Sequence, residues 1–316
     1  MINPYSAIDI AKAIGQPIDA ALPVPVGMAA ICELETADYG DDVYYFSAYD
    51  TNTDIIYTAG DNGEVTSNRK SPSGATALPL VGIQSDLAYV TLEEMQHVTS
   101  SVTNKDLTAL GRKKAAITRS MDKQNMKELC DLILGLSGQE VTSVTADDLY
   151  TMIIKLVQKV EDYADNYILL CGSTIYNAIQ TFEHDNVTTF EYRLGIQELL
   201  TNLHIKVIKM VGSVALDTTS ANAAVLAATK CILVGINSSL VGGKPCLFVR
   251  RKINPEIAKQ LGFPIDSAER LLTTIGGLSI INNSKNILGY GVIGYESRAI
   301  AVTNPYAIAW SDDMAL

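Results

Sequence analysis

The sequence predicts an α+β fold built around one long helix, with strands concentrated in the C-terminal third. Residues 106–134 carry apolar side chains at helical spacing, over a length far above the usual helix of about 11 or 12 residues. Residues 145–182 then predict a helix, a buried strand and a second helix. After residue 204 most apolar runs are short and rich in β-branched residues, which is typical of strands. Apolar residues make up 47% of the chain and no internal repeat or long linker divides it, which indicates a sizeable core.

The N-terminal region predicts one short helix followed by extended backbone and a hairpin. Residues 1–15 have the apolar spacing of a short amphipathic helix, whereas residues 16–40 contain three prolines and predict extended or irregular backbone. Residues 42–50 and 53–58 are rich in aromatic and β-branched side chains. Because only a short join separates them, we expect these two segments to pair as a hairpin.

The segment AGDNGEVTSNRKSPSGATALPL, residues 59–80, has neither a helical nor a strand period. Its glycines, asparagines and prolines are turn-forming residues. A compact domain rarely contains a structureless loop of this length unless the loop has a function. A further strand is predicted directly after it, at residues 85–92.

The long helix is predicted to begin at Asp106, a suitable N-cap, and to end at Gly135. About 29 residues at 1.5 Å each give a length of roughly 43 Å. Lys114 and Asn125 interrupt the apolar stripe at its seam positions. We therefore expect the helix to lie along a surface, with one side only partly covered.

A basic patch is predicted on this helix. Its members are Arg112, Lys113, Lys114 and Arg119. The patch is either a solvated face or a contact for an acidic neighbour or nucleic acid. The whole chain carries 24 Lys and Arg against 35 Asp and Glu, a formal charge of −11, which disfavours general nucleic-acid binding.

The second half of the sequence alternates helices and strands before it becomes strand-rich. Thr145 is expected to open a helix that is amphipathic to residue 164, and Ser173 a second one that reaches residue 182. A less defined helix is predicted at residues 190–202. The expected strands are 167–172, 204–214, 231–236, 245–253, 277–283, 286–296, 297–304 and 306–311.

The sequence has no dense catalytic or metal-binding motif. The five cysteines form no Cys-x-x-Cys pair and lie in apolar runs, so we expect buried, reduced thiols. The three histidines are dispersed, and neither a G-x-S-x-G elbow nor a P-loop is present. No signal peptide or membrane span is evident. We expect a cytoplasmically made protein that is not an enzyme and holds no cofactor or metal.

Taken in order, these features resemble the major capsid protein of tailed bacteriophages, which has the Hong Kong 97-type fold. The resemblance covers nearly the whole chain and rests on the order and character of its segments. The closest local matches are LILG at the end of the long helix, ADNYILLCGSTIYNAI and RAIAVTNPYAIA.

The resemblance implies a set of domains and a function. The chain would self-assemble into the icosahedral head shell that encloses the double-stranded DNA of a phage. Residues 59–80 would be the tip of the E-loop, and residues 106–134 the spine helix. The implied divisions are N-terminal arm 1–40, E-loop hairpin 41–92, peripheral domain with spine helix 93–145, axial domain 146–270, peripheral strands 271–300 and final axial strand 301–316.

The resemblance also implies sites and partners. The expected inter-subunit contacts in the E-loop are Asn62, Gly63, Arg69, Lys70 and Pro72, and the basic patch would face the lumen. Some relatives crosslink an E-loop lysine to an asparagine of the peripheral domain; the matching residues are Lys70 with Asn282, Asn283 or Asn286, but no catalytic glutamate can be aligned. Expected partners are further copies in hexamers and pentamers, a separate scaffold protein, a portal, a decoration protein and weakly held DNA, with no membrane. The expected location is the virion, after assembly in the cytoplasm of the host bacterium.

Three alternatives stay open at this point. An encapsulin is a nanocompartment shell of the same fold that encloses a cargo protein. An α+β enzyme with an unrecognised site would form a small oligomer with a deep polar pocket. A tail or connector subunit would form tubes or rings.

Overall fold

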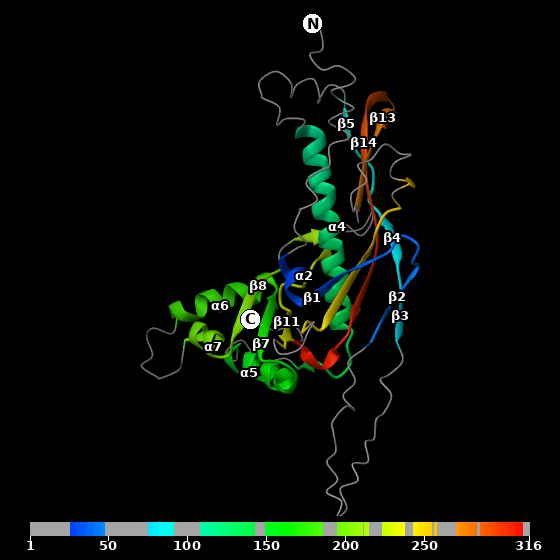
Figure 1. The fold of residues 1–316 in the computed structure, drawn as a ribbon. Helices are drawn as coiled ribbons and strands as arrows, with labels where there is room; N and C mark the ends of the chain where they lie inside the picture. The colour runs from blue at the N-terminus through cyan, green and yellow to red at the C-terminus, as the bar shows by residue number, and fades with distance from the viewer. Residues whose placement is uncertain are drawn as a thin grey trace, which may run out of the picture.

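A computed structural model describes most of the chain and confirms the α+β fold class. The described residues are 26–47, 75–91, 108–142, 149–185, 195–210, 212–214, 223–237, 243–254, 256–257, 270–282 and 285–311. They form a six-stranded sheet, a five-stranded sheet and two short two-stranded ribbons. The long helix α4 runs beside the strands β13 and β14, while α5, α6 and α7 pack against one face of the five-stranded sheet (Figure 1).

The element bounds are as follows. The helices are α2 Val26–Ile31, α4 Thr108–Leu134, α5 Leu149–Val160, α6 Ser173–Asp185 and α7 Ile196–Asn202, with 3₁₀ turns at Glu161–Tyr163 and Pro305–Ala307. The first strands are β1 Cys32–Ala37, β2 Val43–Phe46, β3 Thr76–Pro79, β4 Val81–Gln84, β5 Ala88–Thr91, β6 Glu140–Val141, β7 Asn166–Cys171 and β8 Ile205–Lys209. The others are β9 Ser213–Val214, β10 Ala223–Ala224, β11 Cys231–Ile236, β12 Cys246–Arg251, β13 Arg270–Asn282, β14 Lys285–Val302 and β15 Ile308–Ser311.

The five-stranded sheet has the order β6-β15-β11-β7-β8, and its central strands β7 and β11 are almost wholly apolar. The amphipathic helix α5 buries Leu149, Ile153 and Leu156 against one face of this sheet. At the end of β7, a side chain on Gly172 would overlap the carbonyl oxygen of Ala227, so only glycine fits this crossing.

The six-stranded sheet is organised by β14, which the sequence predicted as two strands but which runs unbroken for 18 residues. On one side β14 pairs with β12 and β13, which lie end to end, and on the other side with β4 and β5. Strand β1 adds to the outer edge of β12 in parallel. Thus β11 and β12, neighbours in the sequence, belong to different sheets.

A second core joins the two sheets beneath the C-terminal half of α4. The helix contributes Met126, Leu129 and Ile133, which pack with apolar residues from both sheets. Those residues include Leu170, Val234, Phe248, Ile300 and Trp310. Helix and sheets therefore share one apolar interior. Within the described residues, no helix is both long and apolar enough to span a bilayer.

The expectation of extended or irregular backbone at residues 16–40 is wrong at residues 26–31, which are helical, and agrees with the extended strand at residues 32–37. Residues 26–31 form α2 and residues 32–37 form β1. Met28, Ile31 and Cys32 are fully buried in the core beneath α4. This order comes from contacts with distant segments, which override a weak local pattern.

The predicted hairpin is only partly covered by the described residues. Strand β2 is present, and it pairs with β3, residues 76–79, which had been predicted as irregular. The expected partner, residues 53–58, lies outside the described residues, as does the predicted helix at 1–15. The β2–β3 ribbon packs Phe46 and Leu78 over Val249 on the outer face of the sheet. Burial of these apolar side chains against the sheet therefore stabilises the β2–β3 ribbon, which the local sequence pattern did not predict.

Candidate functional site

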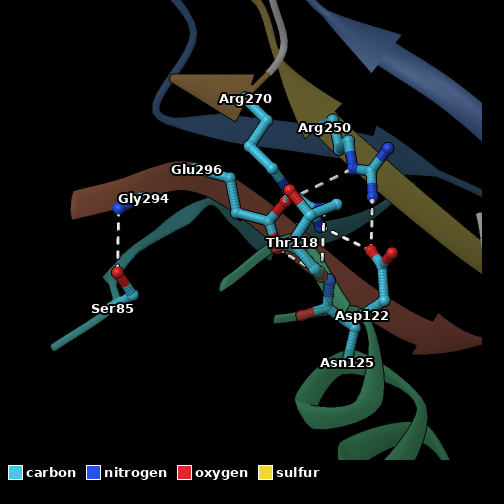
Figure 2. Close-up of polar contacts among 8 residues, drawn as sticks. All are labelled: Ser85, Thr118, Asp122, Asn125, Arg250, Arg270, Gly294 and Glu296. Carbon is cyan, nitrogen blue, oxygen red and sulfur yellow. Dashed lines mark hydrogen bonds and ion pairs between the residues drawn. The ribbon is translucent and has the colours of Figure 1, made fainter. Parts of the chain in front are cut away.

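The face of α4 that meets the sheet changes from apolar to polar midway along the helix. Asp122 and Asn125 lie buried there, and three charged residues of the sheet approach them (Figure 2). These are Arg250 at the end of β12, Arg270 at the start of β13 and Glu296 in β14. We refer to these five residues as the charge cluster.

Arg270 connects the two acids of the charge cluster. Its Nε donates to Glu296 Oε2 at 2.7 Å, and its Nη2 donates to Asp122 Oδ1 at 2.7 Å. Asn125 Nδ2 donates to the other oxygen, Glu296 Oε1, at 2.7 Å. Glu296 therefore accepts direct hydrogen bonds with both carboxylate oxygens, although its side chain is 0% exposed.

The ion pairs of Arg250 with the two acids of the charge cluster are longer than those of Arg270. The Nη2 of Arg250 lies 3.6 Å from Asp122 Oδ1 and its Nε 3.5 Å from Glu296 Oε2, distances of an ion pair rather than a short hydrogen bond. Its guanidinium carbon stands 4.9 Å from the centre of the Phe248 ring. With two carboxylates and two guanidinium groups, the formal charges of the cluster balance.

The junction of β12 and β13 explains why these residues meet. Arg250 pairs in register with Arg298 of β14, and Arg270 with Glu296, two residues away on the same face of the strand. Arg298 donates to the carboxylate of Glu128 one step further along α4. On the opposite side of β14, Ser85 exchanges hydrogen bonds with Gly294 and bridges the break between β4 and β5 (Figure 2).

The environment shifts the pKa values of the two acids in opposite directions. For Glu296, burial alone would raise the pKa, but the charge of Arg270 and the hydrogen bonds from Arg270 and Asn125 outweigh it, so the pKa is lowered. For Asp122, burial is the largest effect and raises the pKa, which Arg270 and Arg250 offset only in part. The charge cluster thus stabilises the ionised form of Glu296 more than the ionised form of Asp122.

The predicted basic patch does not form one exposed surface. Lys113 and Arg119 are exposed, but Lys114 is only 5% exposed, and burial lowers its pKa. The side chain of Arg112 lies outside the described part of the chain. Lys114 and Asn125 do occupy the seam, as expected, but they are buried. The expectation of a partly covered side is therefore wrong at these positions.

The other predicted contacts fall mostly outside the described residues. This applies to all five E-loop residues, Asn62, Gly63, Arg69, Lys70 and Pro72, and to Asn283. Asn282 pairs with Lys285 and Asn286 with Ile281 at the end of the β13–β14 hairpin. The crosslink from Lys70 stays a prediction.

The expectation of buried, reduced cysteines is confirmed, since all five are buried and free. Burial raises the pKa of Cys130 and of Cys231 to about 12. Within the described residues, no group of three or more His, Cys, Asp and Glu side chains is arranged to hold a metal ion.

Large apolar side chains are exposed in the two described segments that precede and follow residues 48–74. Tyr45 in β2 is 65% exposed, and Val81 in β4 and Tyr39 before β2 are each 56% exposed. Free strand edges and exposed aromatic side chains are features of protein–protein contacts.

No protein-family model and no curated protein matches the sequence. Solved structures do match. A phage-related protein from Bordetella bronchiseptica RB50 is similar with a TM-score of 0.51 and 14% identity, over 92% of each chain. The encapsulin of the holo-SrpI complex from Synechococcus elongatus PCC 7942 is similar with a TM-score of 0.50 and 12% identity, over 99% of this chain and 96% of that one. The chain therefore has the Hong Kong 97-type fold of tailed-phage major capsid proteins, as the resemblance predicted.

Proposed function

We propose that the chain is a structural, non-enzymatic shell protein, specifically the major capsid protein of a tailed phage. Many copies would assemble into the icosahedral head that encloses double-stranded DNA. The observation that carries the proposal is the fold, which matches the Bordetella phage-related protein over 92% of both chains. A similarity this complete leaves little of the chain for an additional catalytic domain.

An encapsulin-type shell is the second candidate, because the cyanobacterial encapsulin matches over 99% of this chain. The two functions differ in what the shell encloses. Purified particles of a phage capsid would contain nuclease-protected DNA, whereas encapsulin particles would contain a second protein. Extraction with phenol followed by gel electrophoresis of both phases separates these outcomes.

We assign the domains of this proposal as follows. The five-stranded sheet with α5, α6 and α7 would be the axial domain, and α4 with β13 and β14 the peripheral domain. Since β12 and β1 pair into the sheet of β14, they support placing residues 246–251 and 26–37 with the peripheral part. In place of the bounds implied by the resemblance, the remaining divisions of this proposal are arm 1–25, E-loop 41–92, peripheral 93–139 and 270–302, axial 140–245, and final axial strand 303–316.

Contact between copies would come largely from the E-loop. In this proposal its tip, with Asn62, Gly63, Arg69, Lys70 and Pro72, reaches a neighbouring copy, and exposed apolar residues such as Tyr45 and Val81 take part in the interface. Repeated heterologous contacts of this kind close into rings and then into a shell. A separate scaffold protein, a portal, a decoration protein and weakly bound DNA would complete the virion, with assembly in the host cytoplasm.

Electron microscopy tests the proposal. The full chain is expressed alone and together with its neighbouring structural genes, and the lysate is viewed in negative stain. We expect closed shells with capsomers of five and six copies. Tubes, single rings or small oligomers in every combination would refute the shell function and favour a tail, connector or enzyme role.

A further inference from the structure

Four of the five cysteines face one another in pairs across neighbouring strands. Cys32 in β1 lies opposite Cys246 in β12, and Cys171 in β7 lies opposite Cys231 in β11. Neighbouring strands of a sheet lie about 4.7–4.9 Å apart, in parallel as in antiparallel pairs. A disulfide spans Cα distances of about 4.4–6.8 Å, so both pairs lie within its reach.

Cys32 and Cys246 are both fully buried at these matched positions. The neighbouring Cys32 thiol, followed by burial, raises the pKa of Cys246 well above its usual value. Cys130 of α4 approaches the same pair from the helix side. Joining Cys32 to Cys246 would connect two residues that already face each other across the ladder, without a shift of register.

The two pairs differ in their position within the sheets. Among the described strands, β1 lies at the edge of its sheet and pairs with β12 alone. Strands β7 and β11 are central, each hydrogen-bonded on both sides. Local opening of an edge strand breaks one ladder of hydrogen bonds, whereas opening a central strand approaches global unfolding.

We propose that Cys32 and Cys246 form an oxidative lock, a disulfide that fixes the edge strand β1 to the sheet when the protein passes from a reducing to an oxidising environment. The oxidant is a small-molecule disulfide such as glutathione disulfide. One protein thiolate attacks it and releases one glutathione; the second protein thiolate then attacks the mixed disulfide and releases another. The protein loses two electrons and two protons, and the oxidant becomes two glutathione thiols.

Opening of β1 controls the rate of this reaction. The attacking species is the thiolate, and contact with Cys32 together with burial suppresses the thiolate of Cys246 in the closed strand. Oxidation therefore proceeds through the open form and is slow under native conditions. Cys171 and Cys231, which are buried in central strands, stay reduced until the protein unfolds. The lock is a property of the single chain and does not depend on shell assembly.

The full chain is incubated with glutathione disulfide under native conditions and then digested after alkylation of the remaining thiols. Mass spectrometry should find the peptide of Cys32 linked to that of Cys246, with Cys171 and Cys231 alkylated. Thiol titration in denaturant should fall from five per chain to three, since one pair is lost. The oxidised protein should resist unfolding, with a folding constant raised roughly 30-fold or more and the gain reversed by reductant.

Two variants in the same core separate the lock from general oxidation. Cys130→Ala should still form the Cys32–Cys246 disulfide, and Cys246→Ala should not gain stability from the oxidant. If Cys246→Ala does not fold, the peptide map of the unmodified chain still decides the question. Five thiols after prolonged incubation, linkage to Cys130 instead, or equal oxidation rates for the two pairs would each overturn the proposal.

Discussion

The charge cluster predicts that its two acids contribute unequally to stability. In Glu296→Gln, one carboxylate that accepts with both oxygens becomes an amide with a single acceptor, and its NH₂ group must face either Arg270 Nε or the side-chain amide of Asn125. Two buried guanidinium groups then share one carboxylate. Removing one member of a buried pair costs about 3–5 kcal/mol of the free energy of unfolding. Asp122→Asn also leaves two guanidinium groups with one carboxylate, but it keeps the accepting Oδ1 and removes an acid whose pKa burial already raises, so we expect a loss of only roughly 1 kcal/mol.

The assay is urea unfolding followed by the fluorescence of Trp310, the only tryptophan in the chain, which lies in the core beneath α4. Urea is uncharged and does not screen the cluster. Two protein concentrations exclude a contribution from association. Asp131→Asn is the matched control, because this residue forms an exposed pair with Lys127 on the same helix and should change stability by less than about 0.5 kcal/mol. The reasoning fails if Asp122→Asn costs as much as Glu296→Gln.

Three further predictions concern pH, packing and assembly. The pKa of Glu296 in the folded protein lies below its ordinary value of 4.5. The stability that the ionised carboxylate contributes is therefore complete above pH 4.5 and is lost as the pH falls through the lowered pKa. In urea titrations below pH 4.5, the difference in unfolding free energy between the unmodified chain and Glu296→Gln should narrow. Leu156→Ala, at a fully buried position of α5, should cost about 2–5 kcal/mol in the same assay, and a loss below 1 kcal/mol would contradict the burial described for it. Deleting residues 62–74, which leaves β3 intact, should give a folded monomer by circular dichroism and sedimentation that builds no shell in the microscope; an unfolded monomer would show that this segment belongs to the core of its own subunit.

Sequence patterns predicted the elements whose order is local. The apolar stripe of α4 predicted a helix from residue 106, and the structure begins it at Thr108. The continuous apolar runs of β7 and β11 predicted buried strands, because strands covered on both faces need no polar alternation. In each case the residues that specify the element lie within it.

The charge cluster was missed because its members are far apart in the sequence. Asp122 and Glu296 are brought together only by the packing of α4 on β14, and no periodicity relates them. The one available signal was a charge inside a strand pattern, as Glu296 within GYESRAIAV or Arg250 within LFVRR. Lys114 was placed on an exposed patch for a related reason, since its neighbours in sequence are exposed while its own side chain turns toward the seam.

The unbroken length of β14 has a mechanical consequence. Its pairs with β4, β5, β12 and β13 are arranged side by side along one axis, so a pull along that axis loads many hydrogen bonds together in shear. A pull on β1 at right angles to the strand instead opens its ladder with β12 one pair at a time. The subunit should therefore be stiff along β14 and compliant at β1. In a container under internal pressure, tension directed along β14 would be resisted by the hydrogen-bond ladders of β14 acting together in shear.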